Sequence, residues 1–139
     1  RLTGRVKELF KTAKGKYVAP APIENRLMRH PALEAVCVTG VGRTQPFALA
    51  MPAEAARAQS AGESQRAGLE RELAALLDEV NAELEPHEGL EFIVVVSEPW
   101  TIDNGSLTPT LKIRREVIER RHQQDVEAWA SRRRKVVWA

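Results

Sequence analysis

The chain has 139 residues, of which 43% are hydrophobic and 29% charged, the composition of a globular domain long enough to bury a core. Its 21 basic and 19 acidic residues leave a net charge of +2, too close to balance to indicate a nucleic-acid-binding protein. No apolar stretch approaches the roughly 20 residues that cross a bilayer, and the single cysteine, Cys37, excludes an intrachain disulfide. We therefore expect one domain in a reducing compartment, the cytoplasm.

A β-hairpin is the first predicted element and spans residues 9–18. Two short runs, Leu-Phe-Lys-Thr and Lys-Tyr-Val, flank Ala-Lys-Gly, in which Gly15 takes the position that needs a positive φ. A short helix is predicted over residues 22–29, with proline in its first turn and Glu24 near its positive end.

Two strands are predicted next, at residues 33–40 and 47–51. The first shows little polar alternation, which predicts a central strand, and Cys37 within it is interpreted as a small buried apolar residue. The second follows a turn and is its antiparallel partner. Because the connection is too short for a parallel crossover, a mixed sheet is expected.

An amphipathic helix at residues 69–84 is the clearest element. Its apolar side chains recur at spacings of three, four and seven residues, while charged residues fill the other positions, so we expect it to pack on the sheet. Residues 53–68 before it predict a helical stub and a mobile surface loop. The apolar positions are Leu69, Leu73, Leu76, Leu77, Val80 and Leu84.

Residues 92–96, Phe-Ile-Val-Val-Val, form the most strand-like run in the chain. The turn before it contains His87, which is interpreted as a surface histidine because no second His or Cys lies at metal-binding spacing. No metal site is predicted. Together these elements favour a small α+β domain, a mixed sheet flanked by helices with an N-terminal β-hairpin.

The last predicted elements are a loop at residues 103–113 and a terminal helix at residues 113–133. Asn-Gly and then Pro109 interrupt regular structure in the loop, and Lys112 stands where the loop opens into the helix. A lysine there is a mobile positive charge with three N–H donors, suited to a phosphate or a developing carboxyl-phosphate oxygen when other groups complete the pocket. By itself, the position is more typical of a solvated lysine.

Residues 107–115, Leu-Thr-Pro-Thr-Leu-Lys-Ile-Arg-Arg, resemble the last core motif of adenylate-forming (AMP-binding) enzymes of the long-chain fatty acyl-CoA synthetase type. Residues 3–12, Thr-Gly-Arg-Val-Lys-Glu-Leu-Phe-Lys-Thr, and residues 15–20, Gly-Lys-Tyr-Val-Ala-Pro, resemble the hinge motif and the following hairpin of the same enzymes. The resemblance covers essentially the whole chain, and its two sharp motifs lie near the ends.

This resemblance implies that residues 1–139 are a single C-terminal lid domain, used in two orientations for two half-reactions, and that a large N-terminal adenylation domain is absent. The family makes an acyl adenylate from a carboxylate and ATP, then passes the acyl group to a thiol such as that of CoA. ATP with Mg would be bound mainly by the absent domain, and CoA would be the co-substrate of the second step. The fragment alone is expected to be inactive.

The resemblance also implies roles for single residues. Lys112 matches the catalytic lysine that reaches the α-phosphate and the acyl carboxylate during adenylation. Lys7 matches the hinge, at residues 5–8, which absorbs a backbone dihedral change. Arg5 matches the arginine of the same motif, which meets the nucleotide or the other domain, although an ordinary salt bridge is an equal alternative.

The hairpin matches the segment that lies against the pantetheine path in the thioester orientation. Gly15 would let the backbone approach that ligand closely, and Lys11 or Lys16 would meet phosphates or the other domain, with Tyr17 in the same segment. An ordinary hairpin glycine and ordinary exposed lysines stay open for these positions.

The partners implied for the intact enzyme are its own adenylation domain, a fatty acid, ATP and CoA, without nucleic acid, in the cytoplasm and with peripheral membrane contact left open. One alternative keeps the adenylating fold and changes the acceptor to an acyl carrier protein or a reductase. Another is a non-enzymatic module whose basic residues 132–135, with Trp129 and Trp138, contact nucleic acid.

Overall fold

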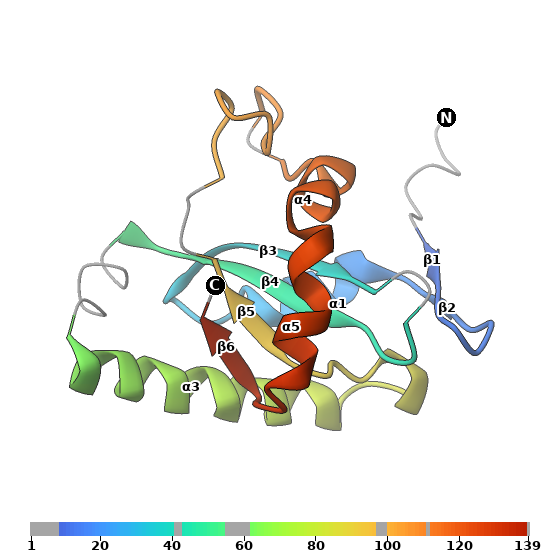
Figure 1. The fold of residues 1–139 in the computed structure, drawn as a ribbon, viewed down its shortest axis with the longest axis horizontal. Helices are drawn as coiled ribbons and strands as arrows, with labels where there is room; N and C mark the ends of the chain where they lie inside the picture. Colours follow the sequence, from blue (N-terminus) through green and yellow to red (C-terminus); the bar gives the residue numbers. More distant parts are fainter. Residues whose placement is uncertain (1–8, 41–42, 55–61, 97–99, 111, 139) are drawn as a thin grey trace.

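The structure, a computed structural model, describes residues 9–40, 43–54, 62–96, 100–110 and 112–138. Its elements in chain order are β1 (Phe10–Lys11), β2 (Tyr17–Val18), α1 (Pro20–Leu27), β3 (Leu33–Thr39), β4 (Phe47–Pro52), α3 (Glu63–Ala82), a 3₁₀ turn (Pro86–Glu88), β5 (Ile93–Val95), α4 (Arg115–His122), a second 3₁₀ turn (Gln123–Asp125), α5 (Val126–Ser131) and β6 (Val136–Trp138). Figure 1 shows α3 along one face of the larger sheet and the α4–α5 segment across the other. The predicted α+β class with flanking helices is confirmed.

The larger sheet has the order β3-β4-β5-β6. β3 pairs antiparallel with β4, whereas β4 with β5 and β5 with β6 pair parallel, so the predicted mixed sheet is confirmed. The prediction of a central strand at residues 33–40 is wrong, because β3 lies at an edge of this sheet. Its low polar content has another cause: Val36 and Val38 are buried against one layer and Cys37 against the other, so both faces are covered.

The strand β6 has no counterpart in the sequence prediction. It pairs with β5 through Ile93↔Val136 and Val94↔Val137, so the chain returns to the sheet after its last helix. The run Val-Val-Trp is short and follows four basic residues, which hides its strand character.

The N-terminal hairpin is confirmed by the antiparallel pairing of Phe10 with Val18. Gly15 has a φ of 81°, and a Cβ there would meet only Lys11 Cε at 3.9 Å, so the backbone conformation rather than crowding favours glycine. The amide of Ala13 donates to the carbonyl of Arg43 at 2.8 Å. The hairpin is thereby attached to the β3–β4 connection.

The helix α1 begins earlier than predicted, at Pro20 rather than residue 22, and ends at Leu27. Proline is tolerated in a first turn because its missing N–H would have no intrahelical partner there. The earlier start places Glu24 beyond the first turn, so it does not lie at the helix N-terminus as predicted. Its carboxylate instead binds groups on two other elements, described below.

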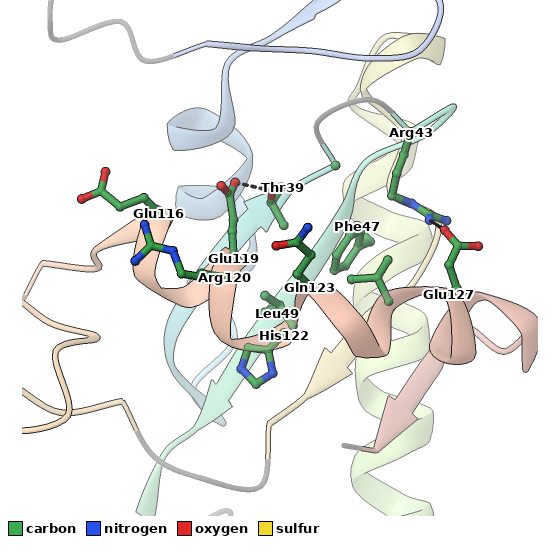
Figure 2. A pocket seen from close by; sticks show the side chains of 12 residues that line it. Thr39, Arg43, Phe47, Leu49, Glu116, Glu119, Arg120, His122, Gln123 and Glu127 are labelled. Carbon is green, nitrogen blue, oxygen red and sulfur yellow. Dashed lines mark hydrogen bonds and ion pairs between the residues drawn. The ribbon is translucent and has the colours of Figure 1, made fainter.

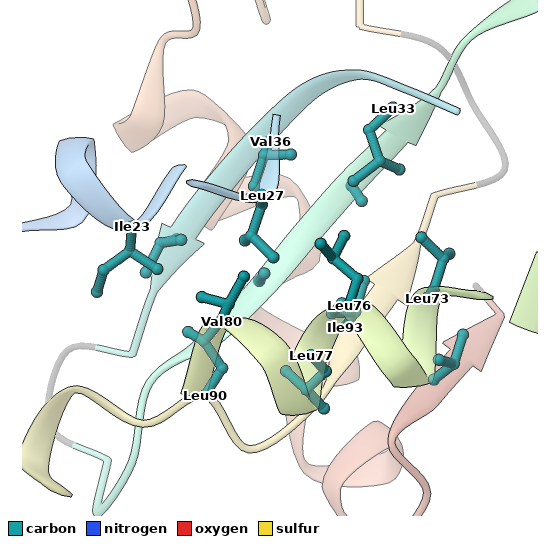
Figure 3. Close-up of a cluster of buried hydrophobic side chains, with 14 of the residues drawn as sticks. Ile23, Leu27, Leu33, Val36, Leu73, Leu76, Leu77, Val80, Leu90 and Ile93 are labelled. Carbon is teal, nitrogen blue, oxygen red and sulfur yellow. The ribbon is translucent and has the colours of Figure 1, made fainter. Parts of the chain in front are cut away.

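The predicted amphipathic helix is confirmed as the centre of one hydrophobic layer (Figure 3). Leu73 and Val80 are fully buried, and they pack with Ile23 and Leu27 of α1 on the same face of the sheet. Of the stub and loop predicted at residues 53–68, the part from residue 63 already belongs to α3, and residues 55–61 lie outside the described residues. The side chains of α3 in this layer are Leu69, Leu73, Leu76, Leu77 and Val80.

The second hydrophobic layer lies on the opposite face, where Ile118 of α4 and Trp129 of α5 cover Cys37 and Leu49. The predicted continuous helix at residues 113–133 is wrong in two respects: α4 starts at Arg115, and a 3₁₀ turn separates it from α5. Residues 120–125 carry no apolar side chain, so packing against the sheet does not hold this stretch in one continuous helix.

Candidate functional site

The loop that carries Lys112 has its two ends joined by backbone hydrogen bonds, and it does not lead directly into the helix. Leu107 and Ile113 form an antiparallel bridge, the Thr108 amide donates to the Lys112 carbonyl at 2.8 Å, and the Lys112 amide donates to Thr108 Oγ1 at 3.1 Å. Thr108 Oγ1 also lies 3.0 Å from Thr110 Oγ1. These bonds fix the backbone on both sides of the turn, and Figure 1 shows the loop projecting beyond the sheet beside α4.

The Asn-Gly turn predicted at the start of this loop is present. The amides of Thr101 and Ser106 both donate to Asn104 Oδ1 at 3.1 Å, and the Asn104 amide donates to Thr101 Oγ1 at 3.0 Å. Gly105 has a φ of 82°, a conformation that glycine adopts without the strain of a Cβ. The base of the loop is therefore held by side chain to backbone bonds that the sequence encodes locally.

The amine of Lys112 is available for another molecule. The residue is exposed, and within the described ranges its amine takes part in no hydrogen bond or ion pair. The helix α4 begins three residues later, so Lys112 does not begin the helix as predicted. An amine on a braced loop combines freedom of the side chain with a fixed backbone position.

The hairpin residues predicted to lie along the pantetheine path are exposed. Lys11, Lys16 and Tyr17 are all exposed, with the Lys11 amine 5.8 Å from the centre of the Tyr17 ring. Figure 1 shows the hairpin well separated from the loop of Lys112, so the two predicted groups of site residues do not meet within the domain. The predicted hinge residues Arg5 and Lys7 lie outside the described residues.

A cleft that sequence analysis did not anticipate lies between β4 and the α4–α5 segment (Figure 2). Its volume is about 540 Å³, with buried Phe47 and Leu49 in its wall. Two polar contacts join residues around it: Thr39 Oγ1 donates to Glu119, and Arg43 pairs with Glu127 at 3.1 Å. No sequence signal could reveal it, because its two sides come from segments far apart in the chain.

The basic tail does not form the exposed aromatic and basic face that the nucleic-acid alternative requires. Arg134 pairs with Glu70 at 3.1 Å and Lys135 with Asp78 at 2.8 Å, both acidic residues of α3. Trp138 Nε1 donates to Glu70 at 2.8 Å, and Trp129 is only 4% exposed. Two of the four basic tail residues thus pair with acidic residues of α3, and one of the two tryptophans is buried, which disfavours that alternative.

Cys37 is confirmed as a buried residue with no exposed surface. Burial raises the pKa of its thiol from 9.0 to about 12, and the nearby Arg115 opposes this shift only in part. Because the thiolate is the nucleophile, this cysteine is a structural residue rather than a reactive one.

We expect a disulfide reagent at pH 8 to label Cys37 far more slowly in the folded chain than in urea, since a pKa of about 12 lowers the thiolate fraction by about 1,000-fold relative to 9.0. A folded-state pKa above the unfolded value also means that stability is fully present below pH 9 and falls as pH rises from 9 toward 12. Absorbance of the released chromophore measures the first effect. Equal labelling rates with and without urea would contradict it.

Among the described helices, none is both long and apolar enough to cross a membrane. The same residues include no group of three His, Cys, Asp or Glu side chains that could hold a metal ion.

The sequence profile of the family described as "AMP-binding enzyme C-terminal domain" matches residues 8–134. The chain therefore belongs to this family, and the resemblance carried by its terminal motifs is confirmed. The long-chain-fatty-acid–CoA ligase FadD15 of Mycobacterium tuberculosis is 32% identical over 141 aligned residues, which cover 91% of this chain and 23% of that protein.

Two further relatives differ in the reaction that their names describe. The chloroplastic long-chain-fatty-acid–acyl-carrier-protein ligase AEE15 of Arabidopsis thaliana is 28% identical over 130 residues, covering 91% of this chain and 17% of that protein. The A-PCP didomain of carboxylic acid reductase from Segniliparus rugosus, solved in complex with AMP, matches with a TM-score of 0.69 and 25% identity over 91% of this chain and 18% of that one. The chain spans less than a quarter of the length of each of these three proteins.

Proposed function

We propose that this chain is the C-terminal lid domain of an ATP-dependent long-chain fatty acid–CoA ligase and that Lys112 is its catalytic residue for acyl-adenylate formation. Membership of the AMP-binding C-terminal family supports the class of reaction. The observation that carries the assignment of Lys112 is its exposed amine on a loop braced by the Leu107–Ile113 bridge. Such an amine can enter a reaction centre formed by a second domain.

In the first half-reaction a fatty acid carboxylate oxygen attacks the α-phosphorus of ATP, and pyrophosphate leaves. Negative charge collects on the α-phosphate oxygens and on the carboxylate as the two anions approach. The N–H donors of Lys112 would stabilise this charge, because a preorganised donor in a water-poor site acts more strongly on the transition state than solvent does. ATP with its Mg²⁺ would be held mainly by the larger domain.

For the second half-reaction we propose that the lid rotates about the hinge at residues 5–8, with Lys7 absorbing the backbone change and Arg5 contacting nucleotide or the other domain. The hairpin would then face pantetheine, with Gly15 nearest the ligand and Lys11, Lys16 and Tyr17 beside it. The separation of the hairpin from the Lys112 loop supports two orientations, because one placement of the domain cannot bring both to one centre.

The experiment that tests this function uses the full-length polypeptide that contains this domain. Fatty-acid-dependent exchange of labelled pyrophosphate into ATP measures adenylation, and thiol-ester formation is then compared between CoA and holo-acyl carrier protein. We expect exchange with long-chain acids and transfer to CoA. Absence of exchange with any carboxylic acid would overturn the proposal.

Transfer to acyl carrier protein or to a carrier and reductase domain is the second candidate, favoured by the names of the two further relatives. Preferential product formation on the carrier protein in the same comparison would select it. We further propose a cytoplasmic enzyme with peripheral membrane contact, since a long-chain acid partitions into the bilayer. Co-sedimentation of the full-length protein with vesicles measures that contact.

A further inference from the structure

A buried ion pair joins the first helix to the start of α4. Arg115, the first residue of α4, donates from Nη1 to Glu24 Oε2 and from Nη2 to Glu24 Oε1 at 3.4 Å. Both side chains are only 12% exposed. A two-point contact between a guanidinium and a carboxylate fixes orientation as well as distance.

The same pair also binds the backbone of the edge strand. The amide of Val38 donates to Glu24 Oε2 at 2.8 Å, and the Val38 carbonyl accepts from Arg115 Nη1 at 3.2 Å. These backbone groups belong to β3, where no further strand of the described sheet could satisfy them. The pair therefore attaches α4 to the sheet backbone itself, and α1, β3 and α4 meet at Val38.

A short and braced path leads from this junction to Lys112. The amide of Arg114 donates to the Ser106 carbonyl at 2.8 Å, and Ile113 is held in its bridge to Leu107. Arg121 of α4 donates to Ser106 Oγ at 3.4 Å, so the helix also holds the far side of the loop. These bonds join the loop to α4, and Arg115 adds a polar attachment to the edge strand beside the packing of Ile118 and the bond between Thr39 and Glu119.

We propose that Glu24 and Arg115 are positioning residues for Lys112, a role that rests on the function proposed above. A buried ion pair is a weak source of stability compared with well-packed apolar residues, because removing both charges from water costs as much as their attraction returns. The pair instead fixes the orientation of α4 and of the Lys112 loop relative to β3. Orientation matters because a displacement of about 1 Å at a reacting group can lower a rate by about 100-fold. In this role the pair holds the Lys112 loop in a fixed position relative to β3.

The test measures both half-reactions in the full-length enzyme. Arg115→Ala is expected to lower fatty-acid-dependent pyrophosphate exchange by about 10- to 100-fold, while thiol-ester formation from supplied acyl adenylate changes by less than about threefold. In the Lys112→Ala background, Arg115→Ala should lower exchange by no more than about a further twofold, because a positioning residue has nothing left to position.

Arg26→Ala is the matched control. Arg26 lies on the same helix as Glu24 and pairs with Glu83 of the segment after α3 at 3.1 Å, and within the described residues it forms no hydrogen bond or ion pair with α4. It should leave both half-reactions within about twofold of the parent enzyme. Arg115→Lys and Glu24→Gln serve if Arg115→Ala does not fold, and each is expected to lower exchange selectively.

Equal loss in both half-reactions, or losses that multiply when Arg115→Ala and Lys112→Ala are combined, would overturn the positioning role while leaving the role of Lys112 intact. Parent exchange rates in both Arg115→Lys and Glu24→Gln would overturn it as well. If Lys112→Ala alone leaves exchange unchanged, the catalytic role of Lys112 fails and the positioning role fails with it, whereas the proposed function fails only if the parent enzyme shows no exchange. The three results are distinguishable in one set of variants.

Discussion

Replacement of Lys112 by alanine is expected to lower the rate of acyl-adenylate formation in the full-length enzyme by about 100- to 1,000-fold, the usual effect of removing one preorganised donor from a charged transition state. The affinity for the fatty acid should change little, because the amine acts where charge develops rather than on the acyl chain. Pyrophosphate exchange at saturating ATP and fatty acid measures the rate.

Two further variants sharpen this prediction. Lys112→Arg keeps the positive charge but changes the shape and the donors, so it should recover only part of the lost rate. Lys14→Ala removes an exposed lysine at the hairpin and should leave exchange unaffected. Equal rates for Lys112→Ala and Lys14→Ala would show that the position of the amine is irrelevant, contrary to the proposed role.

Replacement of Leu73 by alanine is expected to lower the free energy of unfolding of the domain by about 2 to 5 kcal/mol. Leu73 has no exposed surface and lies in the layer between α3 and the sheet, so its loss removes buried apolar area and leaves a cavity. Since domains of ordinary size are stable by about 5 to 15 kcal/mol, this is a large fraction of the total.

Urea unfolding followed by circular dichroism measures this change, with the midpoint shifting and the slope staying constant. The control is Glu79→Ala, an exposed position on the same helix, which should alter the free energy by no more than about 0.5 kcal/mol. A loss for Leu73→Ala that does not exceed that of the control would mean that this layer does not hold the domain together.

Local patterns predicted much of the fold. The spacing of the leucines located α3, and the position of Gly15 located the turn of the hairpin, because both depend on residues within a few positions of each other. The same holds for the Asn-Gly turn, whose bonds join Thr101, Asn104 and Ser106.

Features that depend on distant partners were missed or placed wrongly. The apolar run of β3 predicted a central strand, but its outer edge is closed by side chains of α1 and α4 rather than by a neighbouring strand. The strand β6 pairs with residues on the far side of α4 and α5 in sequence. The partner of Glu24 is Arg115, and charge alone cannot tell which of 21 basic residues meets a given carboxylate.

The candidate site was predicted in part. A motif placed Lys112 in a loop, and the structure adds that its amine is exposed and that its backbone is braced. The braces themselves, Arg115 and Ser106, could not be assigned from spacing because their partners come from three other elements. The roles of Arg5, Lys7 and the hairpin residues stay predictions.

The most direct measurement is thiol-ester formation by full-length Lys112→Ala supplied with chemically prepared acyl adenylate and CoA. If the amine enters the reaction centre only for the first half-reaction, this rate should stay within about threefold of the parent enzyme. A fall as large as the loss in pyrophosphate exchange would contradict the assignment, because Lys112 would then serve the whole enzyme rather than the step that joins two anions.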